Sequence, residues 1–303
     1  MISTVYPLEA LPARTVYRLD GAYKQAMRDR FGWDLAYLDF HLSHWRNIAA
    51  LCAVSREEPH GFCLLVPLAH AVVVTALYLP KASAMSPWAL VLAALRLRRD
   101  WRQYPLEGQP LVPFMPAGSA RPPALHGHIS QRYYLCAGLT DLPVNAPSSP
   151  LSLRAVSDNL QSLSRMLHET YRGHADCLFN SILRQPAGIL TWLQDVCRRN
   201  ICGHFLPCAS ALAVMKRRLA GVCLVSTVGP REAHIVQLAV HPAFQGQGVG
   251  HVLLARAFTQ LRQAGYHRVS LTVSATRAFS WYLRRGFVCR AVFPAFRLRV
   301  LQQ

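Results

Sequence analysis

In the stretch Val240-His241-Pro242-Ala243-Phe244-Gln245-Gly246-Gln247-Gly248-Val249-Gly250-His251, a strand pattern ends and a helix pattern begins around a glycine-rich turn. The apolar run Ile235–Val240 predicts the strand, and the helical spacing of apolar residues starts at Val249. Glycine leaves the backbone of such a turn open to a ligand. Backbone N–H groups and the positive end of the helix dipole then point at one place, which favours a bound phosphate group.

Two common phosphate-binding loops do not fit this spacing. A dinucleotide fingerprint, G-x-G-x-x-G, would need a glycine at position 251, where this chain has His251. A P-loop needs G-K-S or G-K-T, and neither tripeptide occurs in the sequence. What remains is the pattern Q-x-x-G-x-G, which is filled by Gln245, Gly248 and Gly250.

A second motif follows the first. Val249–Ala264 has the helical period and ends at Gly265, His267–Val273 alternates like a half-buried strand, and Ala275–Arg285 is again helical. Residues 278–287, at the end of this helical segment and just after it, have the pattern A-x-x-x-Y-x-x-x-G-F, with Ala278, Tyr282, Gly286 and Phe287 at the fixed positions. The two motifs, in the order strand, glycine turn, helix, strand, helix, resemble the GNAT superfamily of acyl-CoA-dependent N-acyltransferases.

This resemblance implies an α/β fold with a GNAT-type mixed, mostly antiparallel central sheet flanked by helices. It also implies acetyl-CoA, or another acyl-CoA, as co-substrate and no metal. The pyrophosphate would lie on the backbone of the glycine turn, braced by Gln245, and the pantetheine arm would pair with the edge of the preceding strand. The expected acyl-CoA-binding residues are Leu238, Ala239, Val240, Gln245, Gly246, Gln247, Gly248, Val249, Gly250 and His251.

In this family the amine attacks the thioester directly, so the protein must supply a proton donor for the leaving thiolate. Tyr282 matches the usual donor, because a phenol with a pKa of roughly 10 stays protonated at neutral pH. The alternative is a buried aromatic at helical spacing. One departure from the family pattern is Ala275, where the second motif often begins with Asn, and this change puts the acyl-transfer rate or acyl preference in question.

The general base and the acceptor site are the least defined parts of the resemblance. His234 falls where some members carry a catalytic glutamate, and an imidazole can accept a proton there, although His at a strand start is often only a surface residue. Glu169 and Asp176 lie in the region that usually forms the acceptor pocket, where a carboxylate would bind the substrate ammonium. Glu232 is a further candidate, and a relay of water molecules is an alternative to any base.

The proline-rich segment 143–150 predicts a linker between two halves. We expect a catalytic GNAT domain at 151–303. Residues 1–142 would form a degenerate GNAT-like domain, because their turn at Pro80–Ser86 has no glycine, or an unrelated α/β domain. The elements expected in this half are strands at 16–19, 62–67, 72–79, 111–115 and 132–136 and helices at 22–29, 35–50 and 87–101.

Composition limits the remaining classes. The chain has 303 residues and a formal net charge of +18, carried almost entirely by arginine, but the basic residues are scattered, so nucleic-acid binding is not favoured. Nine cysteines without a C-x-x-C pair and the lack of a signal-peptide pattern indicate a reducing cytoplasm. Cys197, Cys202, His204 and Cys208 fit no standard zinc spacing. The apolar stretch Gly61–Pro80 is interrupted by proline and histidine, which favours two strands over a membrane span.

We therefore expect an N-acyltransferase that moves an acetyl or other short acyl group to a primary amine of a small molecule. The alternatives are acetylation of a protein lysine or N-terminus, acyl transfer from an acidic acyl carrier protein, and a non-catalytic acyl-CoA-binding protein. The sequence leaves the choice between monomer and dimer open.

Overall fold

The computed structural model describes residues 4–38, 50–55, 58–68, 70–80, 86–97, 99–108, 124–144, 151–156 and 160–300. The chain forms two compact units that are each assembled from separate parts of the sequence. Unit 1 comprises Met1–Phe31, Phe40–Arg132 and Phe293–Gln303, and unit 2 comprises Gly32–Asp39 and Tyr133–Val292. Among the described helices, none has the length and apolar character that crossing a membrane requires.

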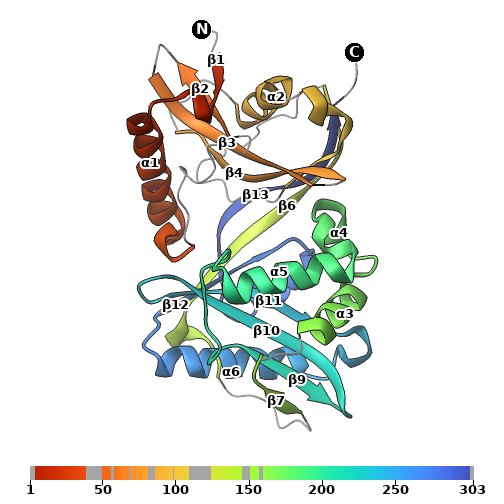
Figure 1. Cartoon of the computed structure of the whole chain (residues 1–303). Coiled ribbons are helices and arrows are strands. Elements are labelled where there is room, and N and C mark those ends of the chain that lie inside the picture. The colour runs from red at the N-terminus through yellow and green to blue at the C-terminus, as the bar shows by residue number, and fades with distance from the viewer. Residues whose placement is uncertain are drawn as a thin grey trace. The chain divides into compact units, whose positions relative to one another are not determined.

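Unit 2 is built on a mixed, mostly antiparallel sheet with the strand order β6-β12-β11-β10-β9-β7 (Figure 1), to which β8 adds beside β10. The pair β11–β12 is parallel, and the other pairs are antiparallel. The strands are β6 (Leu125–Gly138), β7 (Ser152–Arg154), β8 (His204–Phe205), β9 (Ala211–Met215), β10 (Arg218–Gly229), β11 (Glu232–Val240) and β12 (Arg268–Val273). A further strand, β13 (Val288–Val300), begins in unit 2 and continues into unit 1. The helices are α3 (Leu160–Tyr171), α4 (Asp176–Phe179), α5 (Pro186–Arg198), α6 (Val249–Gln263) and α7 (Thr276–Leu283).

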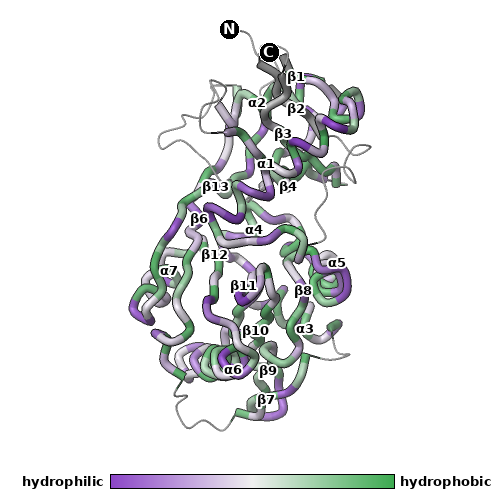
Figure 2. The backbone as a smooth tube through the Cα atoms, turned by 90° about the vertical axis from the view of Figure 1, so that its left-hand side faces the viewer, coloured by the Kyte–Doolittle hydropathy of each residue, from purple (hydrophilic) through white to green (hydrophobic). Residues whose placement is uncertain are grey.

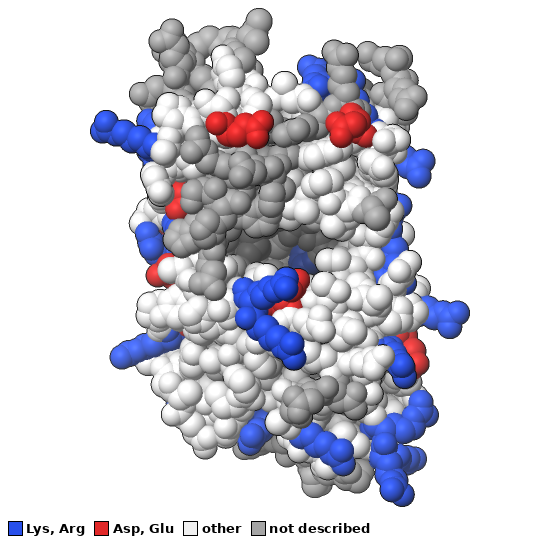
Figure 3. Space-filling model, viewed as in Figure 1, with Lys and Arg blue, Asp and Glu red and all other residues white. Residues whose placement is uncertain are grey.

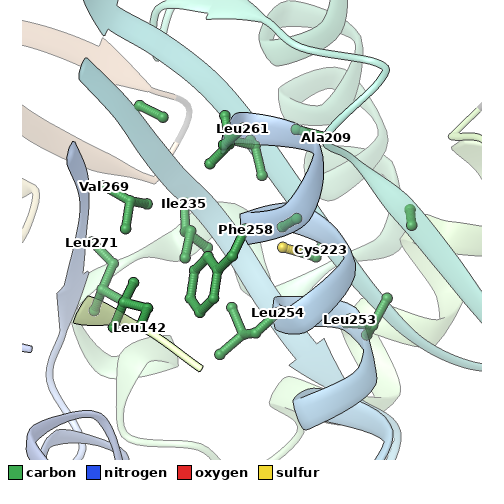
Figure 4. Packing of buried hydrophobic residues seen from close by; sticks show 14 of the residues in the cluster. Leu142, Ala209, Cys223, Ile235, Leu253, Leu254, Phe258, Leu261, Val269 and Leu271 are labelled. Atoms are coloured by element: carbon green, nitrogen blue, oxygen red, sulfur yellow. The ribbon is translucent and has the colours of Figure 1, made fainter. Parts of the chain in front are cut away.

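Helices cover both faces of this sheet. On one face Leu254, Phe258 and Leu261 of α6 point toward Ile235 and Leu271 of the sheet (Figure 4). On the other face α3 and α5 pack their apolar stripes on alternate residues of the same strands, among them Val222 and Leu224. Because β10 is covered from both sides it is buried from residue 220 to 229, and most of it is coloured as hydrophobic in Figure 2. Each large apolar side chain buried in this way contributes about 1.5 to 3 kcal/mol.

Unit 1 has the strand order β1-β2-β3-β4-β5-β13-β6. Its own elements are β1 (Thr4–Pro7), α1 (Ala13–Phe31), β2 (Ala50–Ser55), β3 (Glu58–Leu68), β4 (Ala71–Tyr78), α2 (Pro87–Leu97) and β5 (Leu106–Gly108). The ring of Trp88 on α2 lies 5.1 Å from that of Phe296, and the ring of Tyr23 on α1 lies 5.1 Å from that of Phe62. Trp88 packs with Cys63 and Leu65 of β3 in one hydrophobic cluster, whereas Phe62 projects to the opposite side of that strand, so α1 and α2 cover opposite faces.

The two units repeat one connection. In unit 1 β4 leads through α2 to the parallel strand β5, and in unit 2 β11 leads through α6 to the parallel strand β12. Each repeat is then completed by a strand from the other half of the sequence. Residues 296–298 of β13 pair with β5, and residues 133–138 of β6 pair with β12. The prediction of a GNAT-type mixed sheet in two halves is confirmed.

One predicted element of the N-terminal half is wrong. Residues 16–19 lie inside α1 and not in a strand, because Val16, Leu19, Tyr23 and Met27 are buried at helical spacing on one face. The strands expected at 62–67 and 72–79 lie in β3 and β4, and the helix expected at 87–101 ends at Leu97. Residues 81–85 of the expected turn, the strand 111–115 and most of the helix 35–50 lie outside the described residues. The linker from residue 145 onward does too, and the division into domains at 143–150 stays a prediction.

The surface carries many more basic than acidic side chains. On the face in Figure 3, Lys and Arg side chains lie at several separate places, mostly toward the edges. They do not merge into one continuous patch among the side chains coloured there.

Candidate active site

The parallel strands β11 and β12 separate within unit 2. They pair only from Glu232 to Ile235 on β11, while β11 continues to Val240. A bulge begins at the same point, since Ile235 pairs with Val225 and Gln237 with Leu224, so that Val236 is the extra residue of β11. The edge of β11 after the bulge, which we call the open edge (residues 236–240), has no strand partner on the β12 side among the described strands. Leu238, Ala239 and Val240 all lie on it. An open strand edge can pair with an extended ligand.

The glycine turn follows the open edge directly. Gly246 and Gly248 have φ values of 77° and 79°, a region that glycine enters without strain. Gly248 is also the N-cap of α6 and brings no capping side chain. Within the described chain, the five consecutive backbone N–H groups of residues 246–250 donate to no acceptor. Such a row of unpaired donors at a helix N-terminus fits a phosphate group, and we call these five residues the cradle.

Two glutamines brace this turn from within. The Gln245 Nε2 donates to the carbonyl oxygen of Val240 at 3.1 Å, and the Gln247 Nε2 donates to that of Ala243 at 3.1 Å. The turn is thus held by side chains, which leaves its backbone N–H groups available. The bracing role expected for Gln245 agrees with this contact.

The corresponding helix of unit 1 begins differently. At α2 the Ser86 hydroxyl oxygen accepts the N–H of Ala89 at 3.1 Å, and the Ser86 carbonyl accepts that of Leu90. Pro87 follows as the first helical residue and has no N–H. Most of the donors that a phosphate would need at this helix are therefore absent or already bonded.

Tyr282 lies on α7 in the same hydrophobic cluster as α6, and Leu238 and Val240 pack against that cluster. Its ring contacts those of Trp281 and Phe287, at centroid distances of 4.9 and 5.4 Å. Burial raises the pKa of Tyr282 well above its ordinary value, and the nearby Cys223 and Tyr171 raise it further. The phenol is therefore held protonated, as a proton donor must be.

His234 lies on β11, two residues before the bulge, and is buried. Its Nδ1 lies 2.9 Å from the Ser270 Oγ, and its ring lies 4.8 Å from that of Trp33. The surface position considered from the sequence is therefore wrong. Glu232, on the same strand, pairs with Arg268 at 3.2 Å, and burial raises the pKa of this carboxyl while Arg268 opposes the rise.

The two carboxylates expected in the acceptor pocket have different surroundings. Glu169 is largely exposed, and its Oε2 lies 2.9 Å from the His241 Nε2, beside the start of the glycine turn. Asp176 is more buried, with its Oδ2 3.6 Å from the His174 Nδ1, and its buried Oδ1 has no hydrogen-bond partner among the described residues. Since a buried carboxylate oxygen without a donor is costly, Asp176 is the better candidate for a bound ammonium.

Two residues that the sequence did not single out lie at the bulge. The Gln237 Nε2 donates to the Tyr171 Oη at 2.7 Å, which joins β11 to the end of α3. Tyr171 is close enough to Tyr282 to affect its pKa, and its ring lies 5.3 Å from that of His174. The available signal was a single polar residue, Gln237, within the apolar run Ile235–Val240.

Among the described residues, no group of three or more His, Cys, Asp or Glu could hold a metal ion.

Comparison with known families agrees with this geometry. The sequence model of the Acetyltransferase (GNAT) family matches residues 167–287. That segment is a GNAT acetyltransferase domain and contains the open edge, the cradle and Tyr282. Residues 167–287 therefore place a domain of the acyl-CoA-dependent N-acetyltransferase class in this chain.

Solved structures extend the likeness of fold to the whole chain. A GCN5-related N-acetyltransferase from Sphaerobacter thermophilus is similar with a TM-score of 0.59 and 16% identity, over 99% of this chain and 95% of that one. A tandem GNAT protein from the clavulanic acid biosynthesis pathway is similar with a TM-score of 0.59 and 15% identity, over 98% of this chain and 97% of that one. A comparison with curated protein sequences finds no significant match.

Proposed function

We propose that this protein moves an acetyl or other short acyl group from acyl-CoA to a primary amine of a small molecule. The observation that carries the proposal is the sequence of features along one stretch of chain: an open strand edge, then five unpaired N–H groups at a helix N-terminus. An extended arm ending in phosphates matches both features, and acyl-CoA has this chemistry.

The residues present fit the co-substrate. The cradle would hold the pyrophosphate through backbone N–H groups, and Leu238, Ala239 and Val240 would pair with the amides of the pantetheine arm. The N–H of His251 already bonds to the carbonyl oxygen of Gly248, so this residue would contribute its side chain, whose pKa is lowered by desolvation and by the positive charge of Arg285. When bound, acyl-CoA supplies an activated acyl thioester. No metal is needed for this chemistry.

The protein's own groups would then move two protons. Tyr282 would donate its phenolic proton to the leaving thiolate, because the phenol is protonated at neutral pH. His234, which lies two residues before the bulge of β11, would accept the proton that the amine loses. Asp176 would hold the ammonium form of the acceptor before its deprotonation.

Several features favour a small amine over the other acceptors considered. The buried Oδ1 of Asp176 and the Tyr171–Gln237 pair are recessed polar groups, which suit a compact cationic ligand better than an exposed main chain. We propose acetyl-CoA as the donor and one binding site per chain, in unit 2, because Ser86 and Pro87 occupy the equivalent helix start in unit 1.

The test is an acyl-transfer assay that follows the release of free thiol from acetyl-CoA. A panel of small primary amines, a panel of lysine and N-terminal peptides, and an acylated carrier protein would be compared as partners. We expect turnover with at least one small amine and a kcat/KM for it well above that for any peptide. Turnover with peptides alone, or only with the carrier protein, would contradict the assignment of the acceptor or of the donor.

A further inference from the structure

A row of polar residues crosses the sheet of unit 2 at one register. Ser226 of β10, His234 of β11, Ser270 of β12 and Cys136 of β6 are successive cross-strand partners, and all four are buried. They lie on the face opposite α6, because their neighbours along the strands pack into the α6 cluster. Trp33 covers this row from the segment Gly32–Asp39. Within this row the imidazole of His234 and the hydroxyl of Ser270 are hydrogen-bond partners.

The hydrogen bonds of this row have a direction that begins at Trp33. An indole N–H can only donate, and the Trp33 Nε1 lies 3.0 Å from the Tyr134 Oη. The Tyr134 oxygen therefore accepts the indole proton, and Ser270 is a further hydrogen-bond partner of the same hydroxyl. Ser270 in turn donates its single proton to the carbonyl oxygen of Ala233, at 3.3 Å.

This direction determines which nitrogen of His234 carries a proton. The Ser270 Oγ lies 2.9 Å from the His234 Nδ1 and has already given its proton to Ala233. The lone pairs of the Ser270 oxygen remain for its other contacts, including the contact with the imidazole. Nδ1 must therefore be the donor in this contact, and the neutral ring keeps its lone pair on Nε2.

We infer that Trp33, Tyr134 and Ser270 are positioning residues that hold His234 in the Nδ1–H tautomer, with Nε2 as the proton-accepting nitrogen. The inference rests on the proposed function insofar as His234 serves as the base. It assigns a role to residues far apart in the sequence, one of which comes from the N-terminal half of the chain.

Charged groups on the same face are already paired with one another. Glu232 of β11 and Arg268 of β12 form an ion pair, and Arg268 also takes part in a hydrogen bond with Cys136 of β6. From β10 the group facing His234 is Ser226, whose hydroxyl is buried and has no partner within the described chain. The orientation of the ring is therefore assigned to the hydroxyl of Ser270 and not to a carboxylate.

The test is nitrogen NMR of the full chain labelled with ¹⁵N-histidine, with the His234 signals assigned by their loss in His234→Gln. We expect the proton on Nδ1 in the wild type at neutral pH. In Ser270→Ala that proton should redistribute between the two ring nitrogens, and Tyr134→Phe should weaken the preference in the same direction. Ser226→Ala is the matched control, because the hydroxyl that it removes faces the ring from β10 and has no partner among the described residues. This change should leave the tautomer unchanged.

A wild-type ring protonated on Nε2, or an equal response to Ser226→Ala and Ser270→Ala, would overturn the inference. Should Ser270→Ala not fold, Tyr134→Phe and the wild-type spectrum still decide it. Activity gives a separate answer. We expect His234→Gln to lower kcat/KM about 100-fold or more and Ser270→Ala to lower kcat by roughly tenfold without changing the KM for acetyl-CoA. An Nδ1–H ring together with full activity in His234→Gln would refute the base role alone and leave the tautomer assignment standing.

Discussion

Tyr282 is both a buried core residue and the proposed proton donor, and its burial favours the protonated phenol that a donor needs. The side chain packs with Phe287 and the α6 cluster, and the same burial raises the pKa of its phenol well above the ordinary value. The proton of such a phenol is present throughout the neutral pH range, so it is available when the thiolate leaves. Its aromatic ring packs in the hydrophobic core, while its hydroxyl is the proposed proton donor.

We expect Tyr282→Phe to lower kcat by about 100-fold or more while leaving the affinity for acetyl-CoA unchanged, because only the proton donor is removed. The thiol-release assay and calorimetric titration measure the two quantities. Tyr266→Phe is a matched control in a residue that packs against the same cluster. An unchanged kcat in Tyr282→Phe would contradict the role of the phenol.

Buried tyrosines also predict how stability depends on pH. Burial is the largest cause that raises the pKa of Tyr134, to about 12, whereas a tyrosine in the unfolded chain ionises near roughly 10. The raised value stabilises the fold fully below pH of about 10, and this contribution is lost as the pH rises through 12, because the unfolded state releases the proton first. For Tyr134 the loss amounts to about 2 to 3 kcal/mol.

Urea unfolding at pH values from about 8 to 11 would measure this loss as a falling midpoint. Tyr134→Phe should unfold with a shallower pH dependence than the wild type, although it is less stable at neutral pH for want of its hydrogen bonds. An equal pH dependence in the two proteins would show that Tyr134 ionises as readily in the folded chain as in the unfolded one.

At the scale of elements, substitutions at the start of α6 should change the stability of the fold and the affinity for acetyl-CoA in different ways. Gly248 has a positive φ, so Gly248→Ala should destabilise the fold by about 1 to 2 kcal/mol. Gly250 is not among the glycines of positive φ, and an added Cβ would meet only the Val240 Cγ2, at 3.5 Å. Gly250→Ala should therefore stabilise the helix by up to about 1 kcal/mol.

Both alanine variants should nevertheless bind acetyl-CoA more weakly, because each adds a methyl group to the cradle. Urea midpoints and calorimetric titration give the two quantities separately. A Gly250→Ala protein that is more stable and also binds as tightly as the wild type would mean that the phosphate does not approach the backbone at that residue.

The sequence predicted the elements of unit 2 best where a motif and a period coincide. The strand before Val240, the helix from Val249 and the helix that carries Tyr282 all lie where their apolar spacing and glycines indicated. The segment at Val16 was misread because a short apolar run fits a strand and a buried helix face equally well. Trp33, Tyr171, Gln237 and Ser270 were not identified, since a strand register, a bulge and a covering segment bring them to the site, and periodicity reports none of these.

At the scale of the whole molecule, the strand pairings make the two halves of the sequence dependent on each other. Unit 2 needs residues 133–138 beside β12, and unit 1 needs residues 296–298 beside β5. In unit 2 the segment 133–138, which precedes the proline-rich segment in the sequence, supplies Tyr134 and Leu135, and both are almost completely buried. Losing the burial of several such side chains removes a large share of the roughly 5 to 15 kcal/mol that stabilises an ordinary fold.

We therefore expect the fragments 1–142 and 151–303 not to fold when each is produced alone. Circular dichroism and urea unfolding of each fragment would check this, with the intact chain as the control. A fragment 151–303 that unfolds cooperatively and binds acetyl-CoA would instead support a division into independent domains at the proline-rich segment.

The central claim is that one acyl-CoA binds to each chain, on the cradle of unit 2. Calorimetric titration of the intact protein with acetyl-CoA tests it most directly, with Gly248→Asp and Gly250→Asp as variants that place a carboxylate among the donors. Gly21→Asp is the control, because a side chain there meets nothing within 4 Å. We predict about one equivalent for the wild type and Gly21→Asp and no binding for the two cradle variants. Two equivalents, or binding that survives both cradle variants, would contradict the claim.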